Sequence, residues 1–106
     1  MSRSEAEQEL RDDVVAFLRR HRPDSRIMHE VNVGNGRNRV DVVAVGVDEI
    51  LMVEIKSRLD KLDRLKSQID GMKAHSHTCI AALDRKFMPE ARSAWDKCRI
   101  DEVPFG

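Results

Sequence analysis

The feature that most constrains the fold is a pair of apolar segments, residues 39–45 and 49–56, separated by a short turn. Both are rich in valine and isoleucine and almost continuously apolar, which is typical of central β-strands covered on both faces. Charged residues nevertheless interrupt them: Asp41 in the first segment, and Glu54 and Lys56 in the second. Because an unpaired charge in a covered sheet is costly, these positions are candidates for a functional site.

Helices and strands are predicted on both sides of this pair. Apolar residues recur at helical spacing over residues 4–21, behind Ser4 as a candidate N-cap. Alternation over residues 26–33 predicts a strand, and the following Asn35-Gly36 pair is typical of a tight hairpin turn. The N-terminal half is therefore expected to be a helix followed by three strands.

The C-terminal half continues in the same manner. Leucine, isoleucine and methionine recur at helical spacing over residues 59–72, with Asp60 as a candidate N-cap. A short strand is predicted at 78–83, a third helix at 89–98 and a last strand at 99–103.

This order of elements predicts one α/β domain that spans residues 1–106. A three-stranded antiparallel meander would form its centre. A helical crossover would then lead to a fourth strand parallel to the third.

Composition limits the function classes only weakly. Lysine and arginine number 19, as do aspartate and glutamate, so the net charge neither indicates nor excludes a polyanionic partner. Two cysteines are too few for a disulfide framework, and no apolar run resembles a membrane span or a signal peptide. We expect a cytoplasmic protein with reduced thiols and no membrane association.

The turns predict how the strands align, because opposed residues in an antiparallel hairpin have a constant sum of residue numbers. The second turn gives a sum of about 95, which places Asp41 opposite Glu54. The first turn gives about 71, which places Glu30 opposite Asp41. The sequence therefore predicts three carboxylates in one row on one face of the sheet, with Lys56 on the same face.

Such a row is a candidate site for Mg²⁺ or Mn²⁺. Opposed carboxylates repel each other, and a divalent cation with oxygen ligands would compensate them. The backbone carbonyl of Ile55 could add a ligand. Lys56 could orient or deprotonate an attacking water, or stabilise the charge on a reacting phosphoryl group.

Two other interpretations compete with this site. Asp41 and Glu54 could form plain ion pairs with basic neighbours, namely Arg37, Arg39 or Lys56.

Zinc ligands are the other alternative, since His75, His77 and Cys79 occupy alternate positions and Cys98 follows. Their spacing matches paired zinc motifs poorly, which favours Cys79 as a small apolar residue at the start of a buried strand and His75 and His77 in an exposed loop.

An acid on one strand followed by E-x-K on the next, here Asp41 and Glu54-Ile55-Lys56, resembles the PD-(D/E)XK nuclease superfamily. Val40 replaces the proline that usually precedes the first acid. A longer set of residues is similar to a small bacterial and phage branch near the virus-type replication-repair nucleases and Holliday-junction resolvases. The set is Glu30, Gly36, Arg39 and Asp41, then EIKS, then Asp60, Leu62, Arg64, Leu65 and Gln68. The resemblance covers residues 28–84.

The resemblance implies a restriction-endonuclease-like αβββαβ core and a metal-dependent active site. By this resemblance, Asp41, Glu54 and the Ile55 carbonyl would hold the metal, Lys56 would be the catalytic lysine, and Gln68 would face the site from a helix.

Many members of the superfamily have a further acid near the metal. Here it would be Glu30, which the strand register favours, or Glu9 in the first helix. Some members also carry a tyrosine one helical turn after the glutamine, but this chain has Met72 there and no tyrosine.

The implied function is a Mg²⁺- or Mn²⁺-dependent endodeoxyribonuclease of bacterial or phage origin. It would cut branched DNA, such as junctions or flaps, in repair, recombination or phage DNA processing. Because junction-cutting relatives act as symmetric dimers, we expect a homodimer. The candidate DNA-binding residues are Arg37, Arg39, Arg58, Lys61 and Arg64.

The alternative is a non-catalytic module for nucleic-acid binding or assembly that keeps the nuclease fold. Aromatic residues make up 4% of the chain, so few stacking platforms are available for single strands. Against this alternative, Asp41, Glu54 and Lys56 are all present.

Overall fold

The computed structural model describes residues 4–34, 38–87 and 101–105. The αβββαβ order predicted from the sequence is confirmed. The elements are α1 (Glu5–His21), β1 (Arg26–Val33), β2 (Asn38–Val45), β3 (Ile50–Lys56), α2 (Leu65–Lys73), β4 (Thr78–Asp84), the 3₁₀ turn η1 (Arg85–Phe87) and β5 (Asp101–Phe105).

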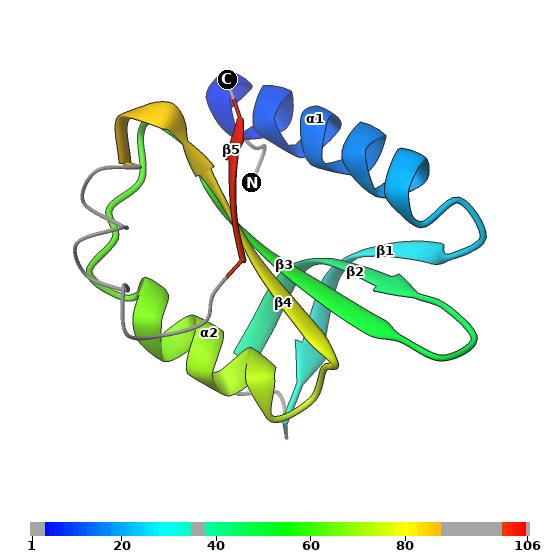
Figure 1. Cartoon of the computed structure of the whole chain (residues 1–106). Coiled ribbons are helices and arrows are strands. Elements are labelled where there is room, and N and C mark those ends of the chain that lie inside the picture. Colours follow the sequence, from blue (N-terminus) through cyan, green and yellow to red (C-terminus); the bar gives the residue numbers. More distant parts are fainter. Residues whose placement is uncertain (1–3, 35–37, 88–100, 106) are drawn as a thin grey trace.

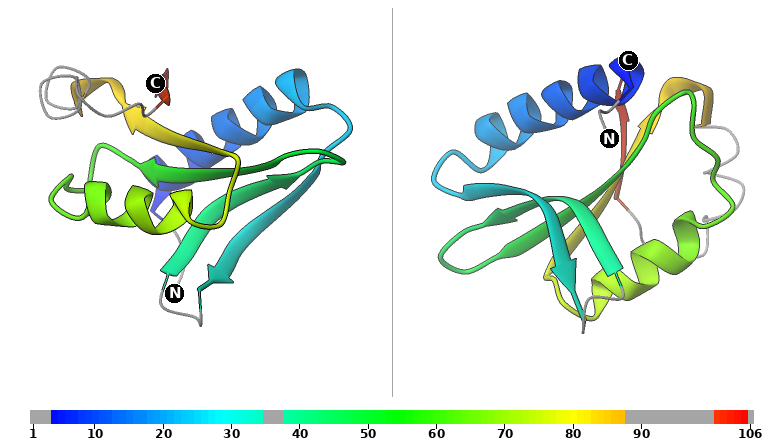
Figure 2. Two further views of the ribbon diagram at one scale, coloured as in Figure 1. Left: turned by 60° about the horizontal axis from the view of Figure 1, so that its bottom comes forward. Right: turned by 180° about the vertical axis from the view of Figure 1, so that it is seen from behind.

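The strands form one sheet in sequence order (Figure 1). β1, β2 and β3 are antiparallel neighbours, as the meander prediction requires. β4 pairs with β3 in parallel, and β5 pairs with β4 in parallel. Figure 2 shows α1 and α2 on opposite faces of the sheet, here named the α1 face and the α2 face.

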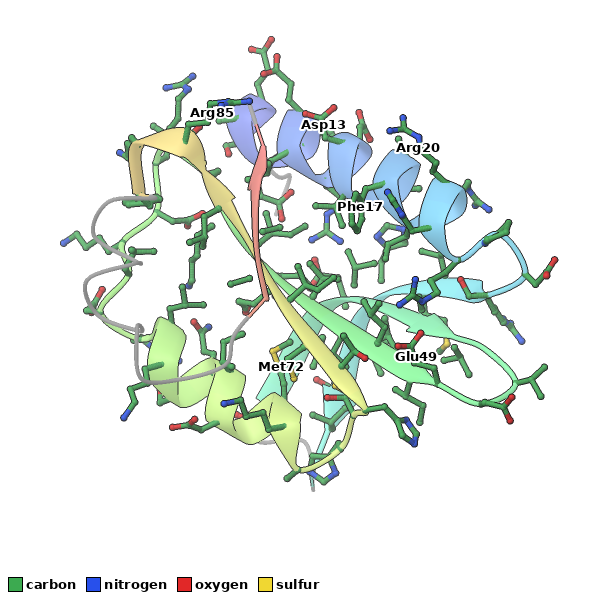
Figure 3. All side chains as sticks on the ribbon, viewed as in Figure 1. Asp13, Phe17, Arg20, Glu49, Met72 and Arg85 are labelled. Carbon is green, nitrogen blue, oxygen red and sulfur yellow. The ribbon has the colours of Figure 1, made fainter. Side chains whose placement is uncertain are left out.

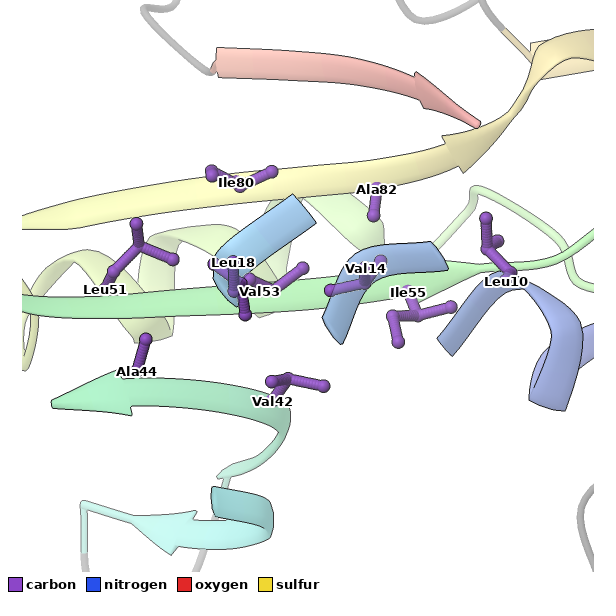
Figure 4. Close-up of a cluster of buried hydrophobic side chains, with 10 residues drawn as sticks. All are labelled: Leu10, Val14, Leu18, Val42, Ala44, Leu51, Val53, Ile55, Ile80 and Ala82. Carbon is purple, nitrogen blue, oxygen red and sulfur yellow. The ribbon is translucent and has the colours of Figure 1, made fainter. Parts of the chain in front are cut away.

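A hydrophobic core lies on each face. On the α1 face, Leu10, Val14 and Leu18 pack on strand residues that include Val42 and Val53 (Figure 4). The α2 face is covered by a second buried cluster, which contains Leu65, Ile69 and Met72 of α2 together with strand residues such as Val43 and Met52. Coverage on both faces accounts for the nearly continuous apolar sequences of β2 and β3.

The apolar stripe of α1 faces the sheet. Ser4 is the N-cap, because its Oγ accepts a hydrogen bond from the Glu7 N–H at 3.1 Å. Figure 3 shows Phe17 pointing from α1 toward the sheet, whereas Arg20 points away from it. No helix among the described residues is long and apolar enough to cross a membrane.

The predicted strand register is confirmed. Arg26 pairs with Val45 at one end of the β1–β2 ladder, and Val33 pairs with Asn38 at the other. In the β2–β3 ladder, Val42 pairs with Val53.

α2 starts later than predicted. It begins at Leu65 with Arg64 as the N-cap, and no side chain caps it. Asp60 instead accepts hydrogen bonds from the Ser57 N–H at 2.7 Å and the Ser57 hydroxyl at 3.0 Å. The segment after β3 is thus closed by a side-chain turn, and Leu59 remains 62% exposed.

Other predictions fall at the edges of the described structure. β5 begins at Asp101 and ends at Phe105, a shift from the predicted 99–103. The helix predicted at 89–98 and the turn residues Asn35 and Gly36 lie outside the described residues.

Removing a core side chain should destabilise the protein strongly. Leu18 is 0% exposed between α1 and the sheet, so Leu18→Ala should lower the free energy of unfolding by about 2–5 kcal/mol. Leu59→Ala is the matched control and should change it by less than about 0.5 kcal/mol. Urea denaturation followed by circular dichroism measures both, and equal losses would contradict the assigned packing.

Candidate metal centre

The candidate site lies where β2 and β3 separate. Their ladder ends at the Val42–Val53 pair, and beyond it β2 bends away from β3 (Figure 1). There the Asp41 carboxylate accepts a hydrogen bond from the Ile55 N–H, with Oδ2 at 2.8 Å from the nitrogen. This region, Asp41 on β2 with Glu54 and Ile55 on β3, is named the fork.

The β1–β2 hairpin turns over at the fork, which means that its side chains exchange faces of the sheet there. Glu30 has a φ of 52°, in the left-handed region that non-glycine residues rarely adopt. On the opposed strand, Val42 packs on the α1 face but Val40 packs on the α2 face. Regular alternation would put both on one face, so the strands change faces at Glu30 and Asp41.

A polar pocket of about 290 Å³ opens at the fork on the α2 side. It brings together Asp41, Glu54 and Gln68, three of the residues predicted to form the site. The full lining is Asn38, Arg39, Asp41, Glu54, Arg64, Gln68 and Met72.

Glu54 is the most unusual group in this pocket. It is only 3% exposed. Burial, the negative charge of Asp41 and a hydrogen bond with the Asp41 carboxyl group raise the pKa of Glu54 to about 9. Lys56, the next residue on the same side of β3, partly opposes this rise in pKa through its positive charge.

Two buried oxygen atoms in the pocket, Glu54 Oε2 and Gln68 Oε1, have no hydrogen-bond partner among the described residues. Buried acceptors are normally satisfied, so both oxygens are available to a cation or a donor. Carboxylate and amide oxygens are ligands that Mg²⁺ and Mn²⁺ prefer. The residues therefore fit a divalent cation, which Asp41 and Glu54 would hold, and the Ile55 carbonyl next to Glu54 is the predicted backbone donor.

The competing interpretation of plain ion pairs is wrong for the partners Arg39 and Lys56, since Asp41 instead lies 3.9 Å from Arg11 Nη2. Neither Asp41 nor Glu54 forms a salt bridge with Arg39 or Lys56 within the part of the chain that the structure describes. Arg39 pairs instead with Glu30, with 3.1 Å between Nε and Oε2. The other predicted partner, Arg37, lies outside the described residues.

A second acidic group lies behind the fork. One carboxylate oxygen each of Glu7, Glu30 and Asp41 lie within 4.8 Å of one another. The Arg11 guanidinium already compensates this group, with Nη2 at 2.8 Å from Glu7, 2.7 Å from Glu30 and 3.9 Å from Asp41. We therefore place the candidate cation in the pocket with Glu54.

The predicted single row of three carboxylates needs correction. The register is right, but the strands turn over at Glu30, and its carboxylate is bound by Arg11 and Arg39. Asp41 and Glu54 line the pocket, whereas Glu30 is not among its lining residues.

In α1, the acid near the fork is Glu7, and Glu9 is exposed. Sequence reasoning missed Glu7 and Arg11. Their spacing of four residues beside the apolar position Leu10 is the signal that could have found them.

The zinc interpretation lacks the required geometry. Among the described residues, His75, His77 and Cys79 do not form a group of three potential ligands. The His77 Nδ1 accepts a hydrogen bond from the Ile50 N–H at 3.0 Å, and the Cys79 thiol contacts the Ser76 hydroxyl. The fourth predicted ligand, Cys98, lies outside the described residues.

Two of the predicted DNA-binding residues lie at the pocket. Arg39 and Arg64 line it and are exposed to solvent. Arg58 and Lys61 are exposed in the segment between β3 and α2. Arg58 and Lys61 are therefore close to the fork only along the sequence, and the fifth predicted residue, Arg37, lies outside the described residues.

Comparison with known proteins gives one family. The model described as bacteriophage P4 protein cII matches residues 1–97. The chain belongs to the bacteriophage P4 cII family. No curated protein and no solved structure matches the chain. The family description names a phage protein and states no activity, so the fork geometry is the basis for a functional proposal.

The raised pKa of Glu54 should make stability depend on pH in the absence of divalent cations. The usual pKa is 4.5 and the folded value is about 9, so folding takes up a proton between these values. Glu54 therefore lowers stability progressively as pH rises from 4.5 toward 9. We expect Glu54→Gln to match the wild type at pH 4 and to be more stable by about 3 kcal/mol at pH 7.

Urea denaturation in EDTA at a series of pH values measures this effect. Glu49→Gln is the control with the opposite sign, because hydrogen bonds from Arg22 and Thr78 lower the pKa of Glu49. That variant should lose stability at neutral pH. If Glu54→Gln had the same stability as the wild type at pH 4 and at pH 7, the assigned pKa would be wrong.

Proposed function

We propose that the chain is a Mg²⁺- or Mn²⁺-dependent endodeoxyribonuclease that acts on branched DNA, such as junctions or flaps. The observation that carries this proposal is the meeting of Asp41 and Glu54 in the fork, where Glu54 Oε2 is buried and has no hydrogen-bond partner in the described part of the chain. The E-x-K sequence and the αβββαβ order support the same assignment, and membership of a phage protein family suits a role in phage DNA processing.

Different residues of the chain would have different roles in phosphodiester hydrolysis. Asp41 and Glu54 would hold the divalent ion, which supplies Lewis-acid stabilisation of the phosphoryl oxygens when it is bound. Lys56 would orient the attacking water or donate to a phosphate oxygen as its negative charge grows. Gln68 would accept a hydrogen bond from the attacking water through its buried amide oxygen.

DNA would approach the fork across its basic surroundings. Arg39 and Arg64 at the pocket mouth would contact phosphates on either side of the cleaved bond, with Arg58 and Lys61 extending this surface. Since the net charge is zero, binding would depend on this local cluster. Arg37 would add to it, and we propose a cytoplasmic homodimer whose two sites act on a two-fold symmetric junction.

The second candidate function is nucleic-acid binding or assembly without cleavage. The raised pKa of Glu54 favours it, because a protonated carboxyl group is a poor ligand for a divalent cation. In that case the fork would serve only as a binding surface.

Cleavage should require a divalent cation, the fork residue Asp41 and the neighbouring Lys56. Purified protein should cut junction or flap DNA with Mg²⁺ or Mn²⁺, and EDTA should abolish the reaction. Asp41→Asn and Lys56→Ala should each lower the single-turnover rate by about 100-fold or more.

Asp48→Asn is the matched control for Asp41→Asn, since Asp48 is exposed in the β2–β3 turn. It should cleave at the wild-type rate. Tight binding to DNA without cleavage under either metal would favour the non-catalytic alternative.

Binding should weaken with salt through the basic cluster. The logarithm of the association constant should fall linearly with the logarithm of salt concentration, by about 0.9 for each phosphate contact. Lys61→Ala should make this slope less steep by about 0.9, the value for one phosphate contact. Fluorescence anisotropy with Arg19→Ala in α1 as the control measures the effect, and a slope near zero for the wild type would exclude phosphate contacts.

A further inference from the structure

Arg11 is a buried cation that connects α1 to the back of the fork. Only 1% of its surface is exposed, although it belongs to an amphipathic surface helix. All five of its N–H donors are used. They bond to both Glu7 oxygens, His29 Nδ1, the Asp41 carbonyl oxygen and Glu30 Oε1.

Two of these bonds reach the point where the hairpin turns over. Nη1 donates to the Asp41 carbonyl oxygen at 2.8 Å, and Nη2 donates to Glu30 Oε1 at 2.7 Å. Asp41 and Glu30 are the residues at which the regular β1–β2 ladder is interrupted. Arg11 therefore supplies a hydrogen bond to the Asp41 carbonyl at the point where the β1–β2 ladder is interrupted.

Asp41 is held through both its main chain and its carboxylate, whose Oδ1 lies 3.9 Å from Arg11 Nη2. Its Oδ2 accepts the Ile55 N–H across the fork, while its main-chain oxygen accepts from Arg11. Any displacement of the Asp41 backbone would move the carboxylate relative to Glu54. The position of the Arg11 guanidinium on the α1 side thus determines the position of the Asp41 carboxylate in the pocket on the α2 side.

We propose that Arg11 is a positioning residue for the candidate metal centre, holding the Asp41 carboxylate in the geometry that a divalent cation requires. This inference rests on the proposed function, because that function assigns the cation to Asp41 and Glu54. Residues that support metal ligands from behind commonly alter metal affinity by about 10- to 100-fold when they are replaced.

Arg11→Lys tests the proposal because it keeps the charge between Glu7 and Glu30. A lysine has three donors on one nitrogen and cannot make the five bonds of the guanidinium. Arg20→Lys is the matched control, since Arg20 is exposed on α1 and points away from the sheet (Figure 3).

The first measurement needs no metal. The Ile55 amide reports the position of the Asp41 carboxylate, because the two are hydrogen bonded. In Arg11→Lys, hydrogen exchange at Ile55 should accelerate by about 10-fold or more relative to Met52 and Val53 in the same strand. Arg20→Lys should leave it unchanged. An Ile55 exchange rate in Arg11→Lys equal to that of the wild type would overturn the proposal.

The second measurement is Mn²⁺ affinity, determined by electron paramagnetic resonance of the free ion. Arg11→Lys should bind Mn²⁺ about 10-fold or more weakly than the wild type and Arg20→Lys. Equal affinities would overturn the proposal and leave the metal centre intact. If the wild type bound no Mn²⁺, the proposed metal centre would fail, and Ile55 exchange would still decide the effect of Arg11 on Asp41.

Glu7→Gln keeps the proposal testable if Arg11→Lys does not fold. It removes the charge of the residue that holds Arg11 through two hydrogen bonds. Ile55 exchange should accelerate in the same direction by a smaller factor. No change in a folded Glu7→Gln protein would count against the proposal.

Discussion

The hydrogen bond between the Ile55 N–H and the Asp41 carboxylate is the interaction on which the rest of the site depends. β3 is a central strand, and its backbone groups must be satisfied where β2 leaves it. A side-chain carboxylate takes the place of the missing ladder partner. The same bond therefore closes the sheet across the fork and fixes an acid beside Glu54, so local stability and the candidate chemistry depend on one residue.

Charge is distributed unequally between the two faces of the fork. On the α1 side, Arg11 binds Glu7 and Glu30, and these opposite charges, together with Asp41, raise the pKa of Arg11 even though desolvation lowers it. On the α2 side, Glu54 is buried, and its Oε2 has no hydrogen-bond partner within the described ranges. This difference is why we place the proposed cation in the α2 pocket and not among the acids behind the fork.

Much of the site could be predicted because its determinants are local. The hairpin register follows from turn position and from the two-residue period of a strand, so the register that brings Asp41 toward Glu54 could be worked out before the fold was known. The start of α2 was mispredicted, because Asp60 suits a cap but bonds to Ser57 instead. A capping residue has the same sequence signature in a turn as at a helix terminus.

The sequence by itself determined the element order, the strand register and the apolar coverage of both sheet faces, since each is encoded by spacing along one segment. Only the tertiary structure decided that the hairpin turns over at Glu30 and that Arg11 is buried behind the fork. The physical reason is that Arg11 is stable there only when α1, β1 and β2 supply its acceptors together. A charge compensated by three separate segments has no periodic signature in the chain.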